Sequence, residues 1–362
     1  MDLKHVKAAI EQGTPLMGEN YSEVDFSGVS LLGGIFLNCN FSGACFNNAE
    51  LSRTKFSQCY LNDCDFSHCE KEDISFFECE LKNATFSGKL VGVSFCNSQL
   101  VGVRFYRAFM DRITFSESDL SDALFCQSNV KRTTIVDVDT HNLALQEVDF
   151  YDVTWMNGDF RHCTVKDCNF NRVMLMESQF ANQQFDQLQF IHCTCSESQF
   201  ENCSFVSSLL DDSNFSQCQF ERCDFSKASL SRALFIQSKI KHCNFSDASM
   251  VHSNFHGATV QDSSLDRANL TESWLKSVDM QTVSALDSVL TRACLIYGKI
   301  INSEFNRAVV KGALVHGLVE TGCSWHGVER EHWDPVAPDE MASESSSGHV
   351  MFSGVWKKLT SR

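Results

Sequence analysis

The 362-residue sequence contains only three prolines, Pro15, Pro335 and Pro338. Proline cannot donate a backbone N–H to a β ladder, so its absence from residue 16 to residue 334 permits one unbroken hydrogen-bonded structure there. The sequence also has no apolar run of 18 residues and no signal-peptide pattern at its start, which argues against membrane association. We therefore expect a cytoplasmic protein, with export by a route that needs no signal peptide as the alternative.

The motifs of common enzyme classes are absent as well. There is no glycine-rich phosphate loop, no nucleophile elbow and no Cys/His/Asp set on loops. Eighteen cysteines suggest disulfides or zinc, but thirteen of them occupy a slot that they share with Ala and Ser. Cys193 and Cys195 come nearest to a metal pair, and no second pair at zinc spacing accompanies them. We expect reduced cysteines, no catalytic residues, no cofactor and no metal.

The dominant feature is an apolar residue that recurs every five positions. One series runs from Phe26 to Phe86, a four-residue step leads to Leu90, and a second series runs from Leu90 to Trp325. Of these 61 central positions 58 are apolar, and they hold 27 of the 30 phenylalanines. The exceptions are Lys71, Thr140 and Glu320. A period of five fits neither a helix nor a simple strand, so it indicates a repeat architecture.

Each five-residue unit has the same internal pattern. The residue two positions before the centre is usually small, and the residue directly before the centre is often Asp or Asn. Units such as 223–227 (CDFSK) and 268–272 (ANLTE) resemble the pentapeptide repeat family, and the resemblance covers about residues 24 to 325. It implies an all-β fold: a right-handed, four-sided parallel β-helix with four units per coil and about 15 coils.

The chain divides into four segments on this basis. Residues 1–22 are expected to form an N-terminal cap with a short helix that begins at Asp2 and stops at Gly13. Residues 23–326 form the β-helix, residues 327–348 a linker rich in Pro, Ser, Asp and Glu, and residues 349–362 an irregular tail with Trp356. We interpret the tail either as a C-terminal cap of the solenoid or as a free docking or dimerisation peptide, with Trp356 as a candidate contact residue.

Function in such a rod is expected on its surface, where residues twenty apart lie in one column. Asp119, Asp139 and Asp159 form an acidic column, close to a second column with Glu117, Asp137, Glu177 and Glu197. One interpretation is a solubilising face; the other is an electrostatic surface that attracts a basic partner.

A second candidate surface is basic and aromatic. Phe109 takes an outward position and should be exposed, and cationic and aromatic side chains are typical of interface anchors. The candidate contact residues are Arg104, Tyr106, Arg107, Phe109, Arg112 and Arg132. Tyr151 and Trp274 are further outward aromatics.

These features favour a non-catalytic scaffold or adaptor that binds a protein partner of unknown identity. The family likeness adds a possible role beside a bacterial secretion system, as an accessory factor or a secreted effector. A homodimer through a solenoid end or through the tail is also open. The acidic balance argues against direct binding of nucleic acid.

The alternative function is mimicry of DNA, because one branch of the family consists of acidic dimeric rods that bind DNA gyrase. The net charge of −16 favours this alternative. The amount of negative charge disfavours it. Duplex DNA of about 70 Å, the length of the expected rod, carries about 40 negative charges, whereas this chain mixes 46 acidic with 30 basic residues.

Overall fold

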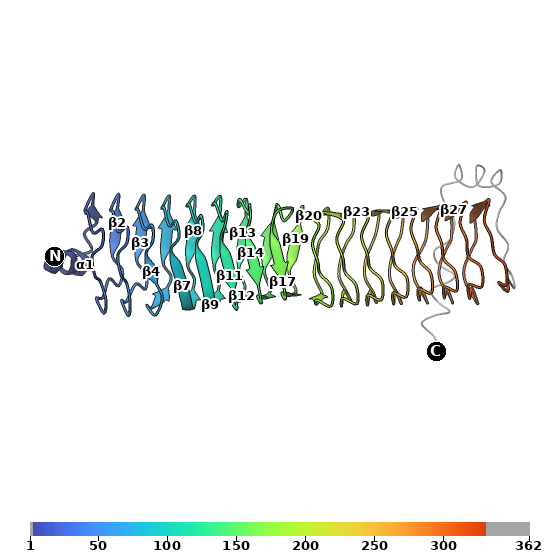
Figure 1. Cartoon of the computed structure of the whole chain (residues 1–362), viewed down its shortest axis with the longest axis horizontal. Helices are drawn as coiled ribbons and strands as arrows, with labels where there is room; N and C mark the ends of the chain where they lie inside the picture. The colour runs from blue at the N-terminus through green and yellow to red at the C-terminus, as the bar shows by residue number, and fades with distance from the viewer. Residues whose placement is uncertain (1–2, 331–362) are drawn as a thin grey trace, which may run out of the picture.

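The computed structural model describes residues 3–330 and shows a long rod of stacked coils (Figure 1). Each coil takes about twenty residues, so Phe115 pairs with Phe95 of the preceding coil and with Ile135 of the following one. The strand pairing is parallel throughout these residues, and the rod has about 15 coils. The predicted fold class, an all-β parallel solenoid with a short N-terminal helix, is confirmed.

One face of the rod is a nine-stranded sheet, which we call the β1–β19 face. Its strands follow one another in chain order, one strand per coil. In each three-residue strand the middle residue is buried and its two neighbours point outward. The strands are β1 (Leu16–Met17), β2 (Ile35–Leu37), β3 (Lys55–Ser57), β6 (Ser75–Phe77), β8 (Ser94–Cys96), β10 (Thr114–Ser116), β13 (Thr134–Val136), β16 (Thr154–Met156) and β19 (Met174–Met176).

Two other faces share an eleven-stranded sheet, because two long strands run through the corner between them. These strands, β7 (Thr85–Val91) and β9 (Arg104–Asp111), pair with a register shift between Phe86 and Gly88. The four-residue step in the period therefore forms a β-bulge. The other strands are β4 (Asp65–Phe66), β5 (Lys71–Glu72), β11 (Leu124–Cys126), β12 (Asn129–Lys131), β14 (Ala144–Gln146), β15 (Asp149–Tyr151), β17 (Thr164–Lys166), β18 (Asn169–Asn171) and β21 (Phe190–Ile191).

The fourth face changes character along the rod. Its N-terminal half is held by single-residue bridges, such as Asp119 with Asp139, and its C-terminal half is an eight-stranded sheet. The strands of this sheet are β20 (Gln179–Ala181), β22 (Gln199–Glu201), β23 (Gln219–Glu221), β24 (Lys239–Lys241), β25 (Thr259–Gln261), β26 (Asp279–Gln281), β27 (Lys299–Ile301) and β28 (Val319–Thr321).

Hydrogen bonds between coils explain why the unit has five residues. The N–H of Phe225 donates to the carbonyl of Asn244 in the next coil at 2.7 Å, and that of Asp224 donates to Cys203 in the preceding coil at 3.0 Å. A turn bond from Ala228 N–H to Phe225 O then closes each corner at 3.1 Å. In each unit, therefore, three residues lie on a pleated face and two form the corner.

The corner requires a left-handed backbone at the residue two after each centre. Lys227 has φ 59° and Arg132 has φ 47°, and the same region recurs in nearly every unit. A non-glycine residue there costs roughly 1–2 kcal/mol, which the buried core and the inter-coil bonds offset. The side chains at these corner positions are mostly exposed, as at Arg132 and Lys227.

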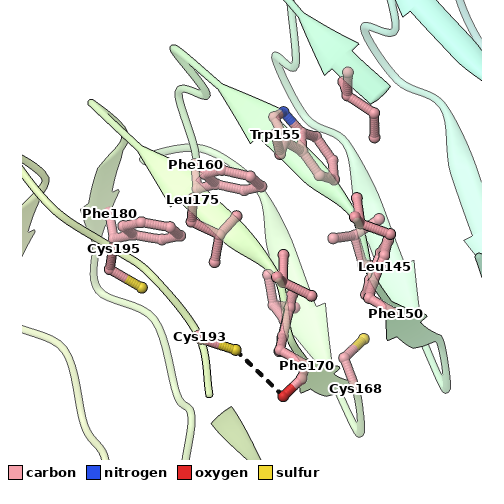
Figure 2. Packing of buried hydrophobic residues seen from close by; sticks show 14 of the residues in the cluster. Leu145, Phe150, Trp155, Phe160, Cys168, Phe170, Leu175, Phe180, Cys193 and Cys195 are labelled. Atoms are coloured by element: carbon pink, nitrogen blue, oxygen red, sulfur yellow. Dashed lines mark hydrogen bonds between the residues drawn. The ribbon is translucent and has the colours of Figure 1, made fainter. Parts of the chain in front are cut away.

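The core is a set of stacked side chains inside the coils. Rings twenty residues apart lie nearly parallel, as in Phe205, Phe225 and Phe245, whose centroids are 4.7 Å apart at each step. Figure 2 shows the same arrangement near Trp155, where a phenylalanine column runs beside buried Leu145 and Leu175. Ring stacking adds about 0.5–1.5 kcal/mol per pair to the burial of the rings.

The N-terminal end of the core is covered by helix α1 (Lys4–Glu11), visible at one end of the rod in Figure 1. Val6 is buried against the first coil, and Nε2 of His5 lies 3.2 Å from the hydroxyl of Tyr21. Leu3, rather than the predicted Asp2, occupies the N-cap, and it makes no side-chain bond there. Asp2 itself lies outside the described residues. Strand pairing already begins at Leu16, so the first coil starts inside the segment 1–22.

The last described coil ends in a polar and aromatic cluster. Trp325 stacks on Phe305 with a centroid distance of 4.3 Å, and its indole N–H donates to Glu320 at 2.7 Å. The guanidinium of Arg330 lies 4.3 Å from the centre of the Trp325 ring. Glu320, which breaks the apolar pattern, is therefore the hydrogen-bond acceptor for the final aromatic residue. The linker from residue 331 and the whole tail lie outside the described residues.

Lys71 also breaks the pattern, and it lies inside the core with 4% of its surface exposed. Its Nζ donates to the carbonyls of Phe66 and Cys69 at 2.8 and 2.7 Å and lies 3.6 Å from Sγ of Cys69. Burial lowers the pKa of Lys71, although the nearby Cys69 opposes this effect. The amine is hydrogen-bonded, yet a charge at this position has lost its hydration.

Replacing Lys71 should therefore change how stability depends on pH. The pKa of Lys71 is lower in the folded chain than its ordinary value of 10.5, so the unfolded chain binds the proton more tightly. Wild type should gain stability relative to Lys71→Met as the pH rises from about 7 toward about 10. Urea denaturation of both proteins at these two pH values measures the difference. A difference that stays constant with pH contradicts the effect of burial.

Candidate protein-binding surface

The described residues offer surfaces rather than deep sites. One shallow hollow of about 500 Å³ is lined by corner and face residues that include Asp152, Arg172, Met174 and His192. No set of three or more His, Cys, Asp or Glu side chains within residues 3–330 is placed to hold a metal ion. In the same range no helix combines the length and apolar character that a bilayer span requires.

The cysteines are free thiols, and most are buried in the inward slot of the repeat. Burial raises the pKa of Cys64 and of Cys193 to about 12, so both stay protonated at neutral pH. Their S–H groups point at backbone carbonyls, as Cys193 does toward Phe170 O at 3.4 Å (Figure 2). These thiols are packing residues that also satisfy carbonyl groups at the corners.

The acidic column of Asp119, Asp139 and Asp159 has a local structural role. Oδ1 of each residue accepts the backbone N–H two residues later, at 2.8 Å from Ser121, 2.9 Å from His141 and 3.1 Å from Arg161. The same turn occurs at Asp25, Asn40, Asp65, Asn214, Asp224, Asn244, Asn254 and Asn269. The preference for Asp or Asn before the centre is thus a turn requirement.

Asp159 is also neutralised, which shortens the predicted acidic column. Arg161 forms a bidentate pair with it, with Nη2 at 2.6 Å from Oδ2, and its hydrogen bonds lower the pKa of Asp159. The second acidic column is different: Glu117, Asp137, Glu177 and Glu197 occupy left-handed corner positions and are exposed. Among the described residues none of these four carboxylates forms an ion pair. The free negative charge of this region therefore lies on the corner rather than on the face.

The basic and aromatic residues come together on the long strand β9, as predicted. Tyr106 and Phe109 are exposed, Phe109 to 41%, because both face outward on either side of the continuous corner. The guanidinium of Arg107 lies 4.9 Å from the centre of the Tyr106 ring and donates to Gln127 at 3.0 Å. Exposed aromatic rings are thus held in place by cations, an arrangement worth about 0.5–1 kcal/mol for each contact.

Two lysines lie beside the Phe109 ring. Nζ of Lys131, which the sequence places next to Arg132 one coil on, lies 5.4 Å from the centre of the ring, and Lys89 pairs with Phe109 across the sheet. Lys89 is missing from the sequence analysis, and the twenty-residue column relation could have found it, because residues 89 and 109 are one coil apart. We call Tyr106, Arg107, Phe109 and Lys131 the β9 cluster.

Arg112 and Arg132 lie at the far end of β9 and have a different environment. Arg132 forms a bidentate pair with buried Asp111, with Nε at 2.7 Å from Oδ1, and these bonds raise the pKa of Arg132. Nε of Arg112 lies 3.9 Å from the same carboxylate. Both guanidinium groups stay exposed, at 57% and 62%. Arg104 is exposed on the other half of β9, next to Thr85 and Leu124.

Other predicted contact residues lie apart from this cluster. Tyr151 is exposed one coil beyond Lys131, with the guanidinium of Arg172 at 5.9 Å from its ring. Trp274 is exposed far along the rod on the continuation of the β1–β19 face. Trp356 lies outside the described residues.

Two segments of the chain, residues 29–105 and 208–290, match the family model described as the pentapeptide repeat region. The chain belongs to the pentapeptide repeat family. No curated protein matches it.

Solved structures of other pentapeptide repeat proteins are similar to this one. Trypsin-treated QnrB1, a plasmid-mediated fluoroquinolone resistance protein, is 21% identical with a TM-score of 0.35, over 51% of this chain and 81% of that chain. HetL, involved in heterocyst differentiation regulation in Nostoc sp. strain PCC 7120, is 14% identical with a TM-score of 0.26, over 70% and 92% of the two chains. Rfr23 from Cyanothece 51142 is 14% identical with a TM-score of 0.24, over 27% and 63%.

The turn role of the aspartate column leads to a prediction. A triple change of Asp119, Asp139 and Asp159 to Asn keeps the Oδ1 acceptors, so it should leave the free energy of unfolding nearly unchanged. The triple change to Ala removes the acceptors and should lower it by about 1 kcal/mol per site. Chemical denaturation compares the two variants. Equal stability of the Asn and Ala variants would show that the turn bonds contribute nothing.

Proposed function

We propose that this pentapeptide repeat protein is a non-catalytic scaffold that binds a protein partner through the β9 cluster. The observation that carries the proposal is the exposed pair Tyr106 and Phe109, each held under a cation on the longest strand of the rod. Aromatic side chains with restrained rotamers lose little entropy on binding, and Tyr and Arg are enriched among binding hot spots.

Charge supports a partner with acidic side chains at its contact surface. The chain as a whole carries a net charge of −16, whereas this region concentrates cations, namely Lys89, Arg104, Arg107, Arg112, Lys131 and Arg132, around one partly buried aspartate. A local field of opposite sign to the rest of the protein would orient an acidic partner toward β9 and raise its rate of association.

The setting we propose is a reducing one. Eighteen free thiols, most of them packed against carbonyls, support a cytoplasmic location. A role beside a bacterial secretion system, or as an effector exported without a signal peptide, is the more specific form of the proposal and rests on the family likeness alone.

Mimicry of DNA is less well supported by the surface. Several acidic corner residues are paired with arginine, as Asp212 is with Arg232 and Asp287 with Arg307, and the aspartate column is used in turns. We therefore expect no inhibition of gyrase supercoiling at micromolar concentrations of this protein. Inhibition that is lost on reversing the charges of Glu117, Asp137, Glu177 and Glu197 would favour mimicry instead.

The scaffold proposal is tested by a matched pair of variants. Leu209 occupies the same outward slot as Phe109 on the same face and is similarly exposed, at 39% against 41%. We expect Phe109→Asp to lower recovery of the partner in affinity capture by at least about tenfold, as for loss of a central anchor. Leu209→Asp should leave recovery unchanged. Quantitative mass spectrometry of both captures measures this, and equal recovery would exclude the β9 cluster as the docking site.

A further inference from the structure

Two of the predicted basic residues, Arg112 and Arg132, and the predicted corner carboxylates lie on opposite edges of the same face. In each coil, the three residues of a strand on the β1–β19 face are preceded and followed by a left-handed corner residue. Arg112 precedes β10 and Glu117 follows it. Arg132 and Asp137 flank β13 in the same way, and Arg172 and Glu177 flank β19. His192 and Glu197 flank the next unit, around Thr194.

In these four coils, between residues 112 and 197, one edge of the face therefore carries bases and the other carries acids at the same height. We call the first the basic edge (Arg112, Arg132, Arg172 and His192) and the second the acidic edge (Glu117, Asp137, Glu177 and Glu197). Between residues 112 and 197 one coil differs: it has the acid Asp152 in place of a base, and the neutral Asn157 lies on the opposite edge.

Between the two edges the face is flat and uncharged. Its outward side chains belong to short parallel strands and are half-buried or exposed, with Met174 exposed to 40%. They are Thr114, Ser116, Thr134, Val136, Thr154, Met156, Met174, Met176, Thr194 and Ser196. Small hydroxyl, valine and methionine side chains suit close contact with a second flat sheet, whereas lysine and glutamate, which interfaces tend to avoid, are absent from these positions.

We propose that this face binds a second copy of the chain in a parallel, side-by-side dimer. A two-fold axis parallel to the rod turns the basic edge of one copy toward the acidic edge of the other and keeps each coil at the height of its equivalent. Arg112 then opposes Glu117, Arg132 opposes Asp137, Arg172 opposes Glu177 and His192 opposes Glu197. The face is self-complementary, which a two-fold interface requires.

Charge also selects the direction of the two rods. A two-fold axis that crosses the rods makes them antiparallel and places each edge against its own equivalent, with Arg112 and Arg132 near other arginines. Like charges in contact are unfavourable, so the antiparallel arrangement is excluded. Residual positive charge is available on the basic edge, because Arg112, Arg132 and Arg172 share two carboxylates, Asp111 and Asp152.

This proposal goes beyond the scaffold function and does not depend on it. The β9 cluster lies on other faces of the rod, so the dimer would leave it exposed in both copies. Two exposed clusters on one assembly would bind a multivalent partner more tightly than one cluster, by raising the effective concentration of the second.

Reversing the charge of one edge at a time tests the proposal. Arg112→Glu with Arg172→Glu reverses two of the four charges of the basic edge, so that acids oppose acids in these coils, and Glu117→Lys with Glu177→Lys likewise makes bases oppose bases. Sedimentation equilibrium should show the wild type approaching twice the chain mass of 40.8 kDa at micromolar concentrations. Each double variant alone should associate at least about tenfold more weakly, and an equimolar mixture of the two should recover the wild-type affinity. Association should weaken as salt rises.

The matched control reverses two arginines on another corner. Arg267 and Arg307 are also exposed and paired with aspartate, at Asp247 and Asp287, but they do not border the β1–β19 face. Arg267→Glu with Arg307→Glu should dimerise like the wild type, and thermal unfolding should confirm that all variants are folded. Fluorescence energy transfer between dyes on the two N-termini should be high, as the parallel arrangement requires.

Four results would overturn the proposal. The wild type could stay monomeric up to about 100 μM, far above the range of a specific dimer. The edge variants could dimerise as well as the control. The mixture could fail to recover association. Finally, dimerisation could depend on residues 331–362 and not on the edges, which would place the contact at the solenoid end or the tail. None of these results bears on the Phe109→Asp comparison, so the two proposals fail separately.

Discussion

Hydrogen bonding between successive coils is the constraint on which the rest of this structure depends. These bonds join each unit to the units about twenty residues before and after it, so a coil consists of four five-residue units. Each unit contributes two inward side chains and one left-handed corner. Once the coils are in register, Phe225 can only stack on Phe205 and Phe245. The core is therefore nearly invariant from coil to coil, and only the outward positions are free to differ.

The same register makes the surface a set of columns, in which the nearest neighbours of a side chain are twenty residues away. Parts of two of the four corner columns alternate in sign: Asp247, Arg267, Asp287 and Arg307 on one corner, and Asp212 with Arg232 beyond the basic edge on another. Exposed pairs of this kind add little stability each, but they leave no net field. A column that does not alternate, such as the one with Glu117 and Glu177, is thus a departure that the fold itself does not need.

The core and the coil length could be predicted from the sequence because a five-residue apolar period admits one way to bury its phenylalanines. The same reasoning placed Phe109 outward, and it could have reached Tyr21 and Leu16, which are in phase with Phe26 and buried. The ion pairs between side chains were harder to predict from the sequence. The pairs Arg161 with Asp159 and Arg132 with Asp111 depend on rotamers and corner angles that the period does not encode. The turn bonds of the aspartate column were missed for that reason.

The β9 cluster arises from the one irregularity of the repeat, and this explains why it is unlike its surroundings. The four-residue step removes one corner residue from the coil of Gly88 and Gly92, and the pairing of β7 with β9 then continues through the corner, although Gly88 and Arg107 keep the left-handed corner backbone. A continuous strand presents side chains on two faces at once, so Tyr106 and Phe109 lie within one element instead of on separate strands. Glycines at positive φ on both sides of Lys89, Gly88 and Gly92, also leave two corners of that coil without side chains. Large exposed rings one coil away are therefore not screened by their neighbours, and cations can lie over them, as Lys131 does over Phe109.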